Sequence, residues 1–79
     1  MSATTIRDPR EVIREEPLMH RPILAALAAG PLTVPEIAAA IGRPSEETLY
    51  WVMGMRRYGA LAEIGDADDD GYFHYEVKT

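Results

Sequence analysis

The sequence predicts a small α+β domain, in which a three-helix core is followed by a C-terminal two-stranded β-hairpin. Helix start and stop signals divide residues 8–59 into helical segments. Two short runs rich in β-forming residues, 60–64 and 72–77, lie on either side of a loop of Asp and Gly. The chain has 79 residues, which is the size of one domain.

The N-terminal part is expected to begin with a short helix. Asp8-Pro9-Arg10-Glu11 combines a capping Asp, a first-turn Pro and an acid three residues after the cap. Pro17 is expected to end this helix, because proline lacks the N–H that a helix interior needs. The first seven residues have no apolar periodicity and predict a loose tail. We therefore expect an N-terminal arm or short helix over 1–19 and the folded domain over 20–79.

The first core helix is expected over 21–29, where several alanines favour helical structure, and Gly30-Pro31 is expected to end it. Thr33-Val34-Pro35-Glu36 predicts the start of the next helix through a capping box.

That second core helix is expected to end at Gly42, and Ser45 is expected to cap a third helix that begins at Glu46. The third helix is expected to stop at Gly59.

Two helices joined by the turn Gly42-Arg43-Pro44 are typical of a helix-turn-helix unit. The stretch from Leu32 to Leu49 resembles the first half of a winged helix-turn-helix domain of the ArsR/MarR type. Val52, Met55 and the run 58–61 resemble the end of that family's recognition helix. The resemblance implies a recognition helix over 46–58 and a wing formed by the hairpin. It does not fix a function, because the same fold serves DNA binding, dimerisation and protein contact.

The charge distribution argues against DNA as the partner. Residues 1–30 and 31–61 are each neutral overall, so the formal net charge of −5 lies entirely in residues 62–79. Duplex DNA binding normally requires a basic patch, and this chain has a single lysine. An acidic wing would face the phosphates that a DNA-binding wing contacts, so each contact there costs about 1 kcal/mol in water.

The helix over 46–58 is expected to have one buried and one exposed face. Its exposed stripe has the spacing four, three and four: Glu46, Tyr50, Met53 and Arg57. Tyr, Met and Arg are enriched in protein interfaces. We therefore expect a non-catalytic domain that docks on a protein partner or on a second copy through this stripe. The residues expected on the buried side are Thr48, Val52 and Met55, which should pack against Leu24, Leu27, Ile37 and Ile41. This buried stripe is flanked by Leu49, Trp51 and Tyr58, and the last two are also expected at the edge of the contact surface.

The alternative is a small, dimeric transcriptional regulator that reads DNA with the same helix. In that interpretation Arg43, Arg56 and Arg57 contact phosphates or bases, and charge reversal at Arg57 eliminates binding at low salt.

Other chemistry has little support in the sequence. Asp66, Asp68 and Asp70 match the opening of an EF-hand calcium loop, but the twelfth position is Val77 instead of Glu. Calcium binding therefore remains an alternative to a solvated turn. There is no cysteine, no phosphate-binding glycine motif and no apolar stretch long enough for a membrane span. We expect a cytoplasmic protein without enzymatic activity, cofactor or membrane contact.

Overall fold

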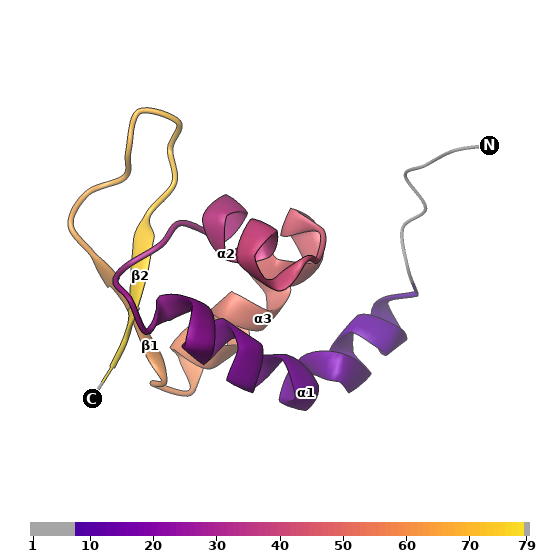
Figure 1. Cartoon of the computed structure of the whole chain (residues 1–79). Helices are drawn as coiled ribbons and strands as arrows, with labels where there is room; N and C mark the ends of the chain where they lie inside the picture. Colours follow the sequence, from indigo (N-terminus) through magenta and orange to yellow (C-terminus); the bar gives the residue numbers. More distant parts are fainter. Residues whose placement is uncertain (1–7, 79) are drawn as a thin grey trace.

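The structure, a computed structural model, describes residues 8–78 and shows three helices followed by a two-stranded antiparallel hairpin (Figure 1). The predicted α+β layout is confirmed, and the arrangement is compatible with a winged helix. The tail expected over residues 1–7 lies outside the described residues. The elements are α1 (Pro9–Leu27), α2 (Val34–Ile41), α3 (Ser45–Arg57), β1 (Leu61–Ile64) and β2 (His74–Val77).

The N-terminal region differs from the prediction, because the two helices expected on either side of Pro17 form one helix of 19 residues. Both Pro17 and Pro22 lie inside α1. Each ring removes an N–H donor and leaves a carbonyl one turn earlier without its helical hydrogen bond. The two prolines are exposed, while Met19, Ile23 and Leu27 are buried against the core. Tertiary packing of the buried side therefore overrides the local stop signal.

The helix ends follow the sequence signals in part. The Thr33 N–H donates to Glu36 Oε1 at 2.8 Å and the Glu36 N–H donates to Thr33 Oγ1 at 3.4 Å, which confirms the capping box of α2. Gly42 ends α2 in the left-handed conformation, with φ of 72°. The expected cap at Ser45 is wrong. The helix α3 begins one residue earlier than predicted, so Pro44 occupies the cap position without a side-chain hydrogen bond.

The hairpin is joined to the segment between α1 and α2. β1 pairs with β2 from Leu61↔Val77 to Ile64↔His74. On the other side of β2, Tyr75 exchanges two backbone hydrogen bonds with Leu32, of 3.1 and 2.8 Å. This bridge connects residues that lie far apart in sequence and fixes the hairpin beside the helices.

One hydrophobic core lies between the three helices and the hairpin. Its largest fully buried side chain is Trp51, and Leu24, which was expected in the core, is 36% exposed. Among the described residues, no helix combines the length and apolarity that a bilayer crossing requires. The buried core residues are Met19, Ile23, Leu27, Val34, Ile37, Trp51, Val52, Met55, Leu61 and Tyr75.

Candidate functional site

The exposed side of α3 carries a stripe of five residues, which we call the α3 face: Glu46, Leu49, Tyr50, Met53 and Arg57. Leu49 is 46% exposed and Tyr50 is 41% exposed, whereas Met53 is half-buried. At about 100° per residue four of these positions fall within a sector of about 60°, and Leu49 lies about 40° beyond its edge. Leu49 was expected beside the buried side, so the structure adds a large apolar residue to the surface that the sequence predicted.

The opposite side of α3 is fully packed. Trp51, Val52 and Met55 are buried, and Trp51 has no exposed surface. The prediction that Trp51 lies at the edge of the contact surface is therefore wrong. Its indole Nε1–H instead donates to the Val12 carbonyl oxygen of α1 at 2.8 Å. Tyr58, the other expected edge residue, is 75% exposed at the end of α3.

Arg43, which the DNA interpretation assigns to phosphate or base contact, is held inside the domain. Its Nη2 forms a short ion pair with Glu15 Oε1 of α1. The same nitrogen lies 3.7 Å from Glu47 Oε1, and the guanidinium lies 5.4 Å from the centroid of the Trp51 ring. Arg43 therefore ties the turn between α2 and α3 to α1, and its charge is largely compensated by carboxylates.

Arg56 is also paired, since its Nε lies 2.5 Å from Glu63 Oε1 on β1. Burial raises the pKa of the neighbouring Tyr75 phenol, Glu63 raises it further, and Arg56 lowers it. Arg57, in contrast, is exposed and forms no ion pair with any residue between 8 and 78. Within the described part of the chain, Arg57 is thus the one arginine of the three expected to contact DNA that has no carboxylate partner.

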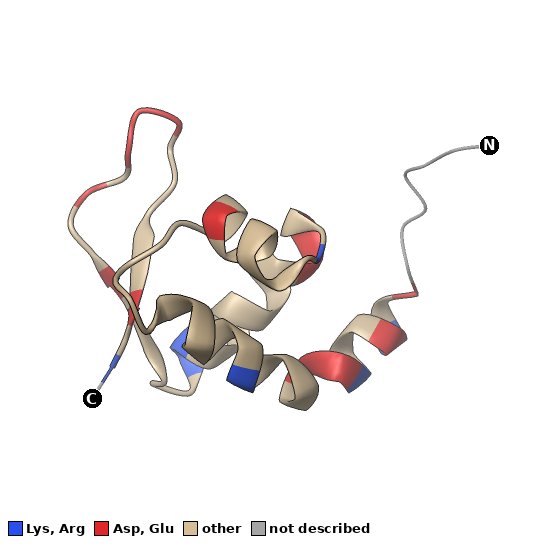
Figure 2. Cartoon of the chain, in the orientation of Figure 1, with Lys and Arg blue, Asp and Glu red and all other residues tan. Residues whose placement is uncertain are grey.

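Acidic and basic residues alternate along α1, whereas the hairpin loop carries acidic residues only. Figure 2 shows acidic residues on the hairpin loop and on the first turns of α2 and α3. The only basic residues of α3 are Arg56 and Arg57 in its last turn. No continuous positive surface therefore runs along the helix over 46–58.

The hairpin loop is organised by its own turn hydrogen bonds. Asp68 Oδ1 accepts the Asp70 N–H at 3.0 Å and the Tyr72 N–H at 2.9 Å. Over residues 8–78, no three His, Cys, Asp or Glu side chains come together in a group that could hold a metal ion. Asp66, Asp68 and Asp70 are thus not gathered into such a group among these residues, and Asp68 acts as a turn former.

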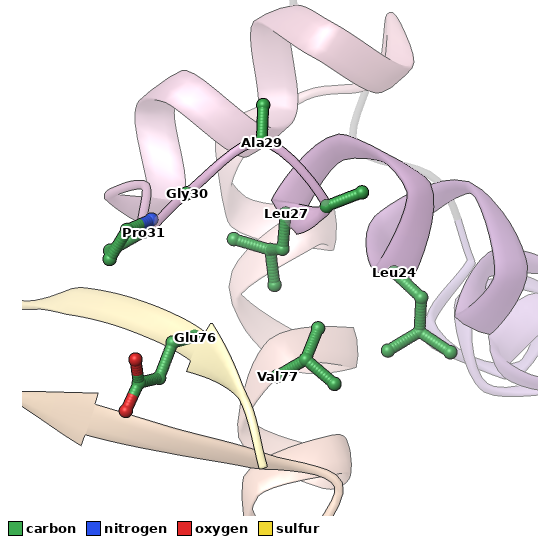
Figure 3. A pocket seen from close by; sticks show the side chains of 8 residues that line it. Leu24, Leu27, Ala29, Gly30, Pro31, Glu76 and Val77 are labelled. Atoms are coloured by element: carbon green, nitrogen blue, oxygen red, sulfur yellow. The ribbon is translucent and has the colours of Figure 1, made fainter. Parts of the chain in front are cut away.

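A shallow open groove, which the sequence did not predict, lies between the end of α1 and β2 (Figure 3). The side chains of Leu24, Leu27 and Val77 point toward it, and Glu76 supplies a single carboxylate at its rim. The groove lacks the several convergent polar groups that orient a small ligand.

Comparison of the chain with protein-family models, with curated proteins and with solved structures gave no match of any of the three kinds.

Proposed function

We propose that this chain is a non-catalytic winged-helix domain that acts through protein–protein contact, with the α3 face as its contact surface. The observation that carries the proposal is the exposure of Leu49 and Tyr50, which lie on either side of Met53 on the exposed side of α3. The sequence resemblance to ArsR/MarR domains supports the assignment of α3 as the recognition helix.

The composition of the α3 face supports a protein partner. Tyr, Met and Arg are enriched in interfaces, and an apolar centre with a polar rim is the common arrangement. Here Tyr50 and the half-buried Met53 form the apolar centre, Leu49 adds exposed apolar surface at one side, and Glu46 and Arg57 form the charged ends. Burial of exposed apolar surface on docking contributes roughly 25 cal/mol per Å² before the costs of association are subtracted.

DNA binding through α3 is the competing function, and the ion pairs count against it. Arg43 and Arg56 would have to leave Glu15 and Glu63 before they could contact phosphates. The acidic hairpin loop adds repulsion. A titration with random-sequence duplex DNA at low salt, followed by amide NMR shifts, gives this alternative its best chance. Shifts along residues 43–58 that vanish as salt rises would overturn the protein-contact proposal.

A photo-crosslinker placed at Tyr50 tests the proposal directly in the cells that make the protein. We expect Tyr50→benzoylphenylalanine to form crosslinks to protein upon irradiation, because the aromatic ring lies at the centre of the contact. The matched control is the same substitution at Tyr72, which is 45% exposed but lies in the hairpin loop. Crosslinks to nucleic acid, or equal crosslinking from Tyr50 and Tyr72, would contradict the proposed contact surface.

A further inference from the structure

We propose that the partner of the α3 face is a second copy of this chain, bound as an antiparallel α3–α3 pair around a two-fold axis. This inference rests on the proposed function, because it uses the same surface.

The spacing of the α3 face is symmetric about its own midpoint, which lies between Trp51 and Val52. Glu46 and Arg57 lie at equal distances from that midpoint, and so do Tyr50 and Met53. In an antiparallel pair with its two-fold axis at this point, Glu46 faces Arg57 of the second copy. Tyr50 then faces Met53 of the second copy. A two-fold interface requires this self-complementarity, because each contact occurs twice.

The charges at the two ends of the face are available for such a contact. Glu46 and Arg57 are exposed and form no ion pair with any described residue. The other acid and the other base of α3 that form ion pairs do so within the domain: Glu47 with Arg43, and Arg56 with Glu63. On this helix one acid, Glu46, and one base, Arg57, therefore have no ion-pair partner among the described residues, and they lie about 16 Å apart along the helix axis.

Charge also selects the orientation of the pair. A parallel pair would place Glu46 against Glu46 and Arg57 against Arg57, which is repulsive at both ends. The antiparallel pair places an acid opposite a base at both ends, and it also opposes the two helix dipoles favourably.

The apolar centre gives the pair its contact area. Leu49 and Tyr50 are exposed, and Met53 is half-buried. About three turns of helix bury less surface than the roughly 1,200–2,000 Å² of stable complexes, so the dimer is weak and depends on protein concentration. In this pair the second copy covers the α3 face, which a DNA-binding winged helix would place in the major groove.

The deciding experiment is sedimentation equilibrium of the full chain over about 10 μM to 1 mM, with charge-reversed variants. Arg57→Glu alone and Glu46→Arg alone each place like charges at both ends of the pair. We expect each to raise the dissociation constant at least about tenfold. An equimolar mixture of the two variants should dimerise again, because each end of the mixed pair then brings one acid opposite one base. The chain that carries both substitutions should also dimerise.

The matched control is Arg21→Glu, which makes the same charge change at an exposed position of α1 and should leave the dissociation constant unchanged. Circular dichroism verifies that each variant is folded. A wild-type chain that stays monomeric up to about 1 mM, a dimer that tolerates both single reversals, or a mixture that does not dimerise would each overturn the inference.

The experiment separates this inference from the function on which it rests. If the chain is monomeric but Tyr50 crosslinks to a different protein, the second copy is the wrong occupant and the α3 face remains a contact surface. If Tyr50 forms no protein crosslink, both are wrong.

Discussion

Gly54 in the middle of α3 allows α1 to approach closely, and the contact can be tested by a double-mutant cycle. A methyl group added at Gly54 would lie 2.6 Å from Glu16 Oε2 and 3.3 Å from its Cδ. The three nearest atoms all belong to Glu16, whose side chain is only 16% exposed. We therefore expect the effect of Gly54→Ala to depend on whether Glu16 is present.

The expected magnitudes follow from two opposing terms. Alanine is favoured over glycine in a helix interior by about 1 kcal/mol. The clash with Glu16 offsets this gain, because displacing the carboxylate from a packed position costs about 1–2 kcal/mol. In the native background, Gly54→Ala should thus lower the free energy of unfolding by about 0–1 kcal/mol. In the Glu16→Ala background, the same change should raise it by about 1 kcal/mol.

Urea unfolding of the four proteins, monitored by circular dichroism, measures the coupling between positions 16 and 54. We expect a coupling energy of about 1–2 kcal/mol, well above the limit for independent sites. Melting temperatures provide a second readout, since about 1 kcal/mol shifts a domain of this size by about 4–8 °C. If Gly54→Ala stabilises both backgrounds equally, the Glu16 side chain does not pack against Gly54 and the proposed close contact of α1 with α3 at this position is refuted.

Three further predictions address the cap of α2, the ion pairs of Arg43 and the hairpin. Thr33→Ala removes the hydroxyl acceptor of the capping box and should lower the free energy of unfolding by about 1 kcal/mol in urea titrations. Arg43→Ala should cost about 1–2 kcal/mol because it removes the ion pairs of Arg43 with the partly buried carboxylates of Glu15 and Glu47, whereas Arg57→Ala should cost less than about 0.5 kcal/mol; equal losses would contradict the assigned ion pairs. Burial raises the pKa of Tyr75 above 10.0, so the unfolded chain releases this proton first as pH rises, and stability should decline above about pH 10. Tyr75→Phe should reduce that decline in unfolding titrations across this pH range, whereas Tyr58→Phe, at an exposed position, should preserve it.

The order of elements could be predicted from local signals alone. The capping box at Thr33 and the left-handed Gly42 act within a few residues, so the sequence around each determines its conformation. The continuity of α1 through Pro17 could not be predicted in this way. It depends on which side of the helix meets the core, and that side is set by residues distant in sequence.

The candidate surface was predicted in outline. Helical spacing placed Glu46, Tyr50 and Arg57 on the exposed side, because a period of 3.6 residues suffices for that. Spacing did not show that Leu49 is exposed, or that Arg43 and Arg56 are held by carboxylates of α1 and β1. Ion pairs between separate elements leave no pattern in one sequence, so they can be identified only in the folded structure.

The hydrogen bond from the Trp51 indole to the Val12 carbonyl makes the only tryptophan of the chain an intrinsic fluorescent probe of α1 packing. The indole is shielded from solvent while α1 is packed against it. It becomes exposed to water when the N-terminal half of α1 dissociates from the core. Its emission should then shift to longer wavelength even if α2, α3 and the hairpin stay in place. Fluorescence and circular dichroism followed together would therefore distinguish local release of α1 from unfolding of the whole domain.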